Sequence, residues 1–248
     1  MAYRRTDRVA ELLAEKRQRI LRAVRTVVGE VGFRGAQVTM VAAAAGVATG
    51  TVYSHFPSKA ELFAEALALN AQHEVDVVAA VAAAEGSAAT RLADAVRVFA
   101  HRAVRARRLA YAMMAEPTDA AVDAARLIYR RAFAEVFEAL IREGMTRNEF
   151  VEQDAAFSAA CLIGALIEGL IGPLAPDAAD LADTAAPVEA IAGFCLRAVT
   201  GPSQPPQETP NDDDRDRFDD ALASPVRAPG SRARQPRLRG RGSPRKRA

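Results

Sequence analysis

Tryptophan is missing from this sequence of 248 residues, and aromatic residues make up only 6% of it. Half of the residues are hydrophobic, many of them alanine. This composition favours helices over strands. The two cysteines, Cys161 and Cys195, lie within apolar helical patterns. We therefore expect two buried free thiols and no disulfide.

Long hydrophobic runs are scarce as well. We find no apolar run of the roughly 18–20 residues that a membrane-spanning helix needs, and no apolar signal core after the arginine-rich N-terminus. We therefore expect a cytoplasmic protein without a membrane partner. The sequence also lacks a nucleophile–base pair, a phosphate loop and metal-ligand spacing, and we interpret His73 and His101 as ordinary helix residues. An enzyme, a metal site and a cofactor are therefore not expected.

Charge is distributed unevenly along the chain, although the formal net charge is only +2. Residues 1–60 carry ten Lys and Arg against four Asp and Glu, and residues 61–200 carry twelve against twenty. Residues 201–248 carry eleven against seven. A basic N-terminal part on an acidic body predicts a polyanionic partner for the N-terminal part alone.

Three helices are predicted close together near the N-terminus. The first, residues 16–31, has an apolar and a basic face, and Gly32 ends it. Thr39 is a candidate N-cap for the second helix, and Gly46 suits the left-handed turn that follows. The third helix covers residues 49–55. Two short helices joined by a tight turn are typical of a helix-turn-helix that reads DNA.

Longer helices are predicted after this motif. Pro57 prevents continuation of the third helix, and Ser58 with Glu61 forms a capping-box pattern. The helical periods and the Gly, Pro and Asp boundaries then predict helices over residues 58–81, 92–106, 108–114, 119–144, 154–171 and 187–199. No alternating strand pattern is found, so the predicted fold class is all-α.

The helix over residues 49–55 is expected to face the DNA. Its first residues, Thr49, Gly50 and Thr51, are short enough to enter a groove, and their hydroxyls can bond to phosphates or base edges. Tyr53 and His55 project on the exposed side of the same helix. An alternative is that Tyr53, like Phe56, is simply a core aromatic residue. Lys59 and the first N–H groups of the next helix would bind a further phosphate.

These residues carry a family resemblance. The sequence resembles the N-terminal domain of TetR/AcrR-type repressors over residues 16–65, through the pattern Thr39-x-x-x-Ala43-x-x-Gly46-Val47-x-x-Gly50-Thr51-x-Tyr53-x-His55-Phe56-x-Ser58-Lys59-x-x-Leu62-Phe63. The resemblance implies a homodimer that binds a palindromic operator and is inactivated by a small ligand. It also implies that seven residues face DNA: Thr39, Thr49, Gly50, Thr51, Tyr53, His55 and Lys59.

Three positions depart from the pattern of that family. Ala48 stands where serine is frequent, Thr49 where a basic or polar residue is frequent, and Ala43 where a charged residue is frequent. We therefore expect differences in helix capping and in one phosphate or base contact. With the resemblance, the domains are a flexible or helical basic extension (1–15), a DNA-binding domain (16–62), a helical effector-binding and dimerisation domain (63–200) and a disordered tail (201–248).

A ligand pocket is expected between the helices of the second domain. Pockets in helical proteins have apolar walls and a few polar groups, and the candidates are Phe99, Tyr111, Met113, Met114, Tyr129, Arg130 and Phe133. The alternative is that these residues are plain core. The arginines at 102, 105, 107 and 108 would meet an anionic ligand or form a solvated helix face. The Met and aromatic content favours an apolar or acyl-type effector.

Dimerisation is expected to use the last two helices. Small residues four apart allow helices to approach closely, and the candidate interface residues are Ala156, Ala160, Gly164, Ile167, Ile191 and Cys195. The alternative is internal packing of the helix over 154–171. In the tail, an acidic block precedes a basic end over residues 227–247, which is either a polyanion-binding arm or a solvated linker. If the basic end is a polyanion-binding arm, deleting residues 202–248 would lower the salt dependence of DNA binding but preserve its specificity.

Two functions are consistent with these features. The first is a ligand-responsive transcriptional regulator, a repressor of the kind the resemblance implies. The second is an effector-independent architectural or nonspecific DNA-binding protein that uses the basic head and tail.

Overall fold

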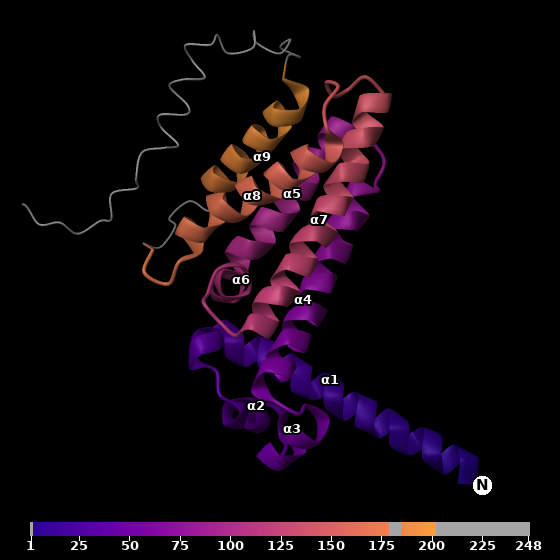
Figure 1. Ribbon diagram of the computed structural model, residues 1–248, viewed down its shortest axis with the longest axis vertical. Helices are drawn as coiled ribbons and strands as arrows, with labels where there is room; N and C mark the ends of the chain where they lie inside the picture. Colours follow the sequence, from indigo (N-terminus) through magenta and orange to yellow (C-terminus); the bar gives the residue numbers. More distant parts are fainter. Residues whose placement is uncertain (1, 179–184, 202–248) are drawn as a thin grey trace, which may run out of the picture. The chain divides into compact units, whose positions relative to one another are not determined.

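The computed structural model of the protein describes residues 2–178 and 185–201, with side chains from residue 8 onward. All regular structure in these residues is helical, which confirms the predicted all-α class (Figure 1). The helices are α1 (Ala2–Gly35), α2 (Val38–Ala45), α3 (Thr49–His55), α4 (Lys59–Ala82), α5 (Ala88–Arg105), α6 (Arg107–Met114), α7 (Ala120–Thr146), α8 (Ala155–Leu174) and α9 (Ala185–Thr200). The predictions for residues 202–248 lie outside the described residues.

One hydrophobic core joins α1, α2, α3 and the first half of α4. Phe56 is almost fully buried in it, in the same cluster as Val24 and Val28, as expected of a core aromatic residue. The core also takes in Ala112 of α6 and Val122 of α7. The head formed by α1–α3 is therefore packed directly on helices of the body.

The boundaries of the first two helices differ from the expectation. Helix α1 continues to Gly35 with a break at Gly32, whose φ of 73° and ψ of 176° are not helical. Only Ala36 and Gln37 then separate α1 from α2, so Gln37 is the N-cap of α2. The prediction of Thr39 as N-cap is wrong for this reason. Thr39 lies in the first turn of α2, with its side chain exposed.

The N-terminal extension is helical and continuous with the rest of α1. Figure 1 shows this first part of α1 running clear of the other helices. Three apolar side chains on it, Val9, Leu12 and Leu13, are about half exposed (51%, 55% and 49%). No described part of the chain covers them.

The body is built around a second core. Helix α4 packs along α7, α7 along α8, and α5 along α9, and Figure 1 shows α4 and α7 running side by side. The Ser87 and Asp154 side chains accept backbone N–H bonds and so cap the starts of α5 and α8. Pro187, expected at the first position of α9, lies at its third because the helix begins at Ala185.

Helix α8 is more apolar than expected, because no apolar run of membrane-spanning length was predicted from the sequence. Among the described residues it alone is long and apolar enough to cross a membrane, with a mean hydropathy of 1.9. The helix extends through Pro173 to Leu174, past the predicted end. Its side formed by Leu162, Leu166 and Leu170 is buried in the core of the body. Length and composition alone are therefore weak grounds for a membrane span.

Candidate DNA-binding face and ligand pocket

The turn between α2 and α3 is held by backbone hydrogen bonds. Gly46 has the left-handed conformation predicted for it (φ 64°, ψ 40°), and its N–H donates to the carbonyl of Ala43 at 3.1 Å. The Val47 N–H donates to the carbonyl of Ala42 at 3.0 Å. Val52 is buried in the head core. These contacts fix the direction in which α3 leaves the turn.

The residues predicted to face DNA lie on the solvent side of the head. Thr39, Gly50 and Tyr53 are exposed, and Tyr53 has half of its surface accessible (50%). The other predicted contacts are partly exposed: Thr49, Thr51, His55 and Lys59. A methyl group added at Gly50 would meet no atom within 4 Å, so this part of α3 is open to close approach.

The starts of α3 and α4 are capped differently. Ala48 is the N-cap of α3 and supplies no side-chain hydrogen bond, as expected from the missing serine. At α4 the predicted cap is confirmed, because the Glu61 N–H donates to the Ser58 hydroxyl at 3.1 Å. The ammonium of Lys59, in the first turn, lies 5.2 Å from the centre of the Phe63 ring. The α4 start thus combines a cation with helix N–H groups, which suits an anion.

Helix α1 is fixed to α4 by a charged pair beside the head core. The Arg17 guanidinium donates to both carboxylate oxygens of Glu65, and its central carbon lies 4.5 Å from the centre of the Phe56 ring. The sequence predicts only that this stretch of α1 has a basic face, to which Arg17 belongs. Its contacts show that it also positions α1 against α3 and α4.

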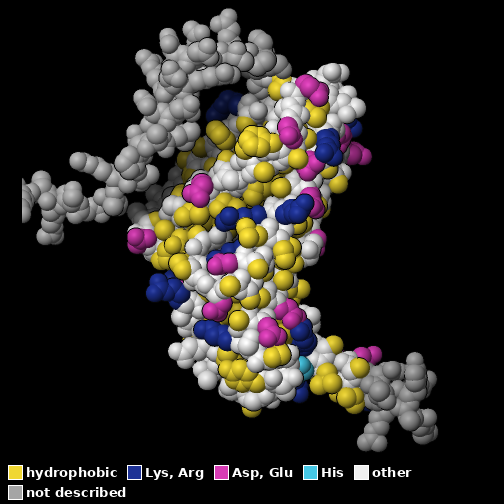
Figure 2. Space-filling view, in the orientation of Figure 1, with side chains coloured by type: hydrophobic (Ala, Val, Ile, Leu, Met, Phe, Trp, Pro, Cys, Tyr) yellow, Lys and Arg dark blue, Asp and Glu magenta, His cyan; other side chains and the backbone are white. Residues whose placement is uncertain are grey.

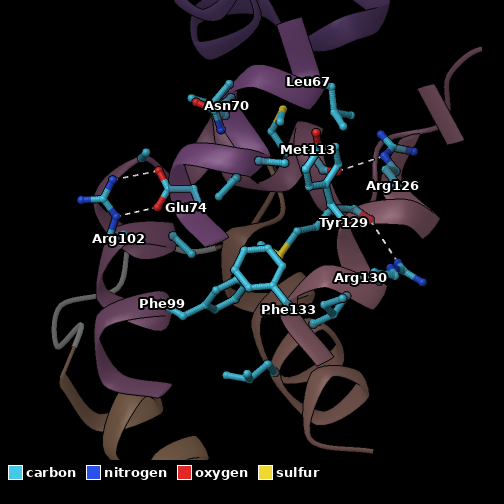
Figure 3. A pocket seen from close by; sticks show the side chains of 18 of the residues that line it. Leu67, Asn70, Glu74, Phe99, Arg102, Met113, Arg126, Tyr129, Arg130 and Phe133 are labelled. Carbon is cyan, nitrogen blue, oxygen red and sulfur yellow. Dashed lines mark hydrogen bonds and ion pairs between the residues drawn. The ribbon is translucent and has the colours of Figure 1, made fainter. Parts of the chain in front are cut away.

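A pocket of about 120 Å³ lies where α1, α4, α5, α6, α7 and α8 meet. Six of the seven predicted pocket residues line it: Phe99, Met113, Met114, Tyr129, Arg130 and Phe133. Figure 3 shows the Phe99 and Phe133 rings together, and their centres are 5.2 Å apart in an edge-to-face arrangement. Tyr111 does not line the pocket, although it packs against the body core.

Polar groups gather on the α4 side of this pocket. The Arg102 guanidinium donates to the two carboxylate oxygens of Glu74 at 2.5 and 2.9 Å, and Asn70 lies on the same helix as Glu74 (Figure 3). The hydrogen bond with Glu74 raises the pKa of the Arg102 guanidinium. Arg25 of α1 also reaches the pocket.

Arg126 connects the pocket with the end of α6. It lines the pocket, and its guanidinium donates to the backbone carbonyls of Ala112 (2.6 Å), Met113 (2.9 Å) and Glu116 (2.6 Å). Burial lowers the pKa of the Arg126 guanidinium, whereas the neighbouring Asp123 carboxylate acts in the opposite direction. The sequence offered no signal for this role, because each contact depends on how α6 and α7 pack.

Glu116 links the loop after α6 to the break in α1. Its carboxylate accepts hydrogen bonds from the N–H groups of Phe33 at 2.8 Å and of Arg34 at 3.2 Å. Because Gly32 interrupts the helical bonding here, Glu116 provides an acceptor for backbone groups that α1 itself does not satisfy. Arg126 and Glu116 together therefore form a polar connection from the pocket to the head.

The predicted dimer residues divide into two groups. Ala156, Ala160 and Gly164 are exposed along one side of α8. In contrast, Ile167, Ile191 and Cys195 lie in the core of the protomer, and Cys195 has no exposed surface. The helical period of α9 does not reveal which partner its apolar side meets.

Other apolar side chains are exposed near the small residues of α8. Phe157 on α8 is 69% exposed and Phe194 on α9 is 54% exposed. Figure 2 shows hydrophobic side chains gathered on the upper part of the visible face, where Figure 1 places α7, α8 and α9.

The cysteines also differ from the expectation, because Cys161 is exposed and only Cys195 is buried. Burial raises the pKa of the Cys195 thiol to about 11, which makes it unreactive at neutral pH. Within the part of the chain that the structure describes, no three His, Cys, Asp or Glu side chains group as metal ligands would.

Comparison with known protein families gives a match for the head of the chain. Residues 20–66 match the family model of bacterial regulatory proteins of the tetR family. A search of curated proteins gave no match. Among solved structures, the fatty acid degradation regulator FadR from Bacillus halodurans is 22% identical with a TM-score of 0.64, covering 73% of this chain and 94% of its own.

Two further structures share the fold. FadR from Bacillus subtilis, solved with stearoyl-CoA, is 18% identical with a TM-score of 0.64, covering 73% of this chain and 98% of that one. RolR, solved with resorcinol, is 19% identical with a TM-score of 0.59, covering 77% and 90%. At these identities the likeness establishes the fold alone.

The chain thus combines a helix-turn-helix head of a DNA-binding type with an all-helical body. The family match is confined to the head, so it relates residues 20–66 to the DNA-binding domain of tetR-family regulatory proteins.

Proposed function

We propose that the protein is a repressor that binds a palindromic operator as a homodimer in the cytoplasm and is released by a small-molecule effector. This proposal rests on one observation: two helices belong both to the core of the head and to the wall of the pocket. Helices α1 and α4 build the head core, and the same helices line the pocket through Arg25, Leu67 and Asn70. A molecule in the pocket therefore touches the elements that hold the DNA-reading head.

The head would read DNA mainly through α3. Thr49, Gly50 and Thr51 would enter the major groove, where hydroxyls and the threonine methyl group meet base edges. Around them, Thr39, Tyr53, His55 and Lys59 would contact the phosphates. The exposure of all seven residues supports this assignment. The exposed methyl groups of Ala43 and Ala48 leave those two positions without a polar contact.

The effector is proposed to be mainly apolar. Fourteen of the twenty residues that line the pocket are Leu, Met, Phe, Ile, Ala or Tyr, and its volume of about 120 Å³ is similar to cavities that hold a benzene-sized molecule. Structures of the same fold have been solved with resorcinol in RolR and with stearoyl-CoA in FadR from Bacillus subtilis. Both an aromatic ring and an acyl chain are therefore suitable classes to test.

Release would follow from a shift in the position of the head. Tyr129 lines the pocket and packs against both the head core and the body core. Arg126 and Glu116 extend this connection to the backbone of Phe33. A ligand that favours a different α6 position would change the spacing of the two α3 helices in the dimer. Operator half-sites about 34 Å apart would then no longer fit.

The dimer is proposed to form through the exposed faces of α8 and α9. Phe157 and Phe194 would provide apolar area, and the small residues Ala156, Ala160 and Gly164 would allow close helix contact. Ile167, Ile191 and Cys195 are assigned to the protomer core instead. A shared four-helix arrangement would cover the apolar surface that α8 exposes in the protomer.

DNA recognition is tested by selecting binding sequences from random duplexes and measuring affinity at several salt concentrations. A repressor selects one palindrome, whereas an architectural protein gives no consensus. Lys59→Gln should reduce the slope of log affinity against log salt by about 0.9, the effect of one phosphate contact. Thr51→Ala should relax preference at one base pair. Arg131→Gln, an 84% exposed side chain on α7, is the matched control and should change neither quantity.

The effector is sought by thermal shift with panels of phenols and acyl compounds, followed by operator release measured by fluorescence anisotropy. A ligand at 100 times its Kd stabilises the protein by about 2.7 kcal/mol and raises Tm by about 5–10 °C. The same compound should release the selected operator. Stabilisation without release, for every binding compound, would contradict a ligand-responsive repressor.

A further inference from the structure

A second hollow lies between α1 and the junction of α5 and α6. It has a volume of about 470 Å³, and four arginines line it: Arg25, Arg105, Arg107 and Arg108. Among the described residues, no carboxylate lines it. We propose that this hollow, the arginine cleft, binds the anionic head of the effector, which is then an amphiphile with an apolar part and a phosphate-type group. The proposal rests on the ligand-responsive function above and specifies its ligand.

Three of the four guanidinium groups are available to a ligand. Arg107 donates to the backbone carbonyls of Ala175 at 2.8 Å and Ala178 at 2.7 Å, so it has a structural role. Arg25, Arg105 and Arg108 are exposed and form no hydrogen bond or ion pair with other described residues.

This arrangement differs from that of three buried or half-buried arginines of the body. Arg91, Arg102 and Arg126 each pair with a carboxylate, namely Glu143, Glu74 and Asp123 respectively. Around the arginine cleft, Arg25, Arg105 and Arg108 face one hollow without such partners among the described residues, and the mutual repulsion of their charges decreases when an anion binds. Guanidinium groups also match the paired oxygens of a phosphate.

The arginine cleft lies next to the apolar pocket and shares a wall with it. Arg25, Ala106 and Leu109 line both hollows. A ligand whose apolar part contacts Leu109 from the pocket side therefore has its other end beside the arginines. Ala106, the N-cap of α6, offers no side-chain acceptor, so the first N–H groups of α6 add donors at the same place.

DNA is the competing polyanion for these arginines. The shared wall favours the amphiphile, because a DNA backbone has no apolar group to place in the pocket. The residues proposed to read DNA also lie on α2, α3 and the start of α4, whereas the arginine cleft involves the α5–α6 junction. The two alternatives predict different effects of removing the arginine charges.

The test compares three probes by isothermal titration of the full chain: 1-octanol, octyl phosphate and inorganic phosphate. Octyl phosphate should bind at least about tenfold more tightly than 1-octanol, the gain from one charge-assisted hydrogen bond. The double variant Arg105→Gln/Arg108→Gln should lose this gain while its affinity for 1-octanol stays unchanged. Arg22→Gln, an exposed arginine of α1 outside the arginine cleft, is the control and should keep the gain.

Octanoyl-coenzyme A forms a fourth arm that distinguishes a nucleotide-type head from a simple phosphate monoester. A further tenfold gain that the double variant abolishes would assign the nucleotide-type head, and equal affinity would assign the monoester. Thermal unfolding of both variants verifies that they fold.

Other outcomes overturn the proposal. If 1-octanol binds and octyl phosphate binds no better, the arginine cleft has no anion role, but the ligand-responsive function stands. If neither binds, both proposals fail. If the double variant loses DNA affinity and salt dependence while the octyl phosphate gain persists, the arginines contact DNA instead. An equal loss of the gain in Arg22→Gln would show nonspecific charge attraction.

Discussion

Gly32 is restricted in two independent ways. Its φ of 73° with ψ of 176° belongs to a region that glycine alone occupies readily. A Cβ at this position would also lie 2.6 Å from Oε2 of Glu116, the carboxylate that accepts the Phe33 and Arg34 N–H groups. A side chain here would therefore strain the backbone and displace the connection between head and body.

At the residue scale, we expect Gly32→Ala to lower the free energy of unfolding by about 1–3 kcal/mol. Urea denaturation of the full chain measures this. Gly50→Ala is the matched control, because Gly50 is helical and its surroundings are open. It should leave stability unchanged or raise it by up to about 1 kcal/mol, while weakening DNA binding. Equal losses in both variants would contradict the role given to Gly32.

Contacts between residues close together in the sequence could be predicted, and contacts between residues far apart in the sequence could not. Ser58 was recognised as a cap because its partner Glu61 is three residues away. The cap of α2 was misplaced on Thr39 because a two-residue link to α1 has no local signature. The Glu116–Phe33 bond joins residues 83 positions apart, and the sequence contains no pattern that indicates it.

At the element scale, Arg91 fastens three helices together. It is the one buried charged residue among those described, and its guanidinium donates to the carbonyl of Ala82 at 2.9 Å and to Glu143 Oε1 at 2.5 Å. The first bond satisfies a carbonyl at the C-terminus of α4, and the second joins α5 to α7. Its Nε has no partner, so its position depends on these two bonds.

The Arg91–Glu143 pair should make stability depend on pH. The hydrogen bond from Arg91 lowers the pKa of Glu143 below its ordinary value of 4.5. Because the folded state binds this proton less readily than the unfolded state, the pair stabilises the fold fully above about pH 4.5 and loses its effect as the pH falls further. Glu143→Gln should therefore be less stable than wild type at neutral pH and lose less stability on acidification.

Denaturant titrations between neutral pH and about pH 3 measure this difference. Glu152→Gln, an exposed carboxylate without a described partner, is the control and should follow the wild type. Parallel pH profiles of wild type and Glu143→Gln would contradict a stabilising role for the pair.

Helical periodicity showed which helices are amphipathic but not what each face meets. The sequence placed small residues on one side of α8, and the structure leaves Ala156, Ala160 and Gly164 exposed there. The same reasoning assigned Ile191 and Cys195 of α9 to an interface, and they fill the protomer core instead. A period of 3.6 residues identifies an apolar side, and only tertiary packing decides its partner.

At the scale of the whole molecule, the exposed side of α8 predicts the oligomeric state. Phe157→Asp should weaken dimerisation more than about tenfold, because a charge would replace a central apolar side chain. Analytical ultracentrifugation at several concentrations measures this. Leu127→Asp, at a 65% exposed residue of α7, is the control and should leave the dimer intact. Because this variant dimerises less, its affinity for the operator should also be lower than that of the wild type.

Thiol reactivity gives a second readout of the same interface. Cys161 lies on the exposed side of α8, so dimerisation should protect it and Phe157→Asp should expose it. Cys195 is buried with its pKa raised to about 11 and should be unreactive in both proteins until they unfold. Reaction of Cys161 at the same rate in wild type and variant would contradict an interface on this side of α8.

The bond between Glu116 and the α1 backbone also limits how freely DNA-reading heads can be exchanged between regulators of this fold. A chimera with this head on another body keeps the Phe33 and Arg34 N–H groups but loses the carboxylate that accepts them. Transplanting operator specificity therefore requires an acidic side chain at the corresponding place in the recipient. Under the proposed function, a head exchanged without this side chain would still fold and bind its DNA sequence but would not respond to the recipient's ligand.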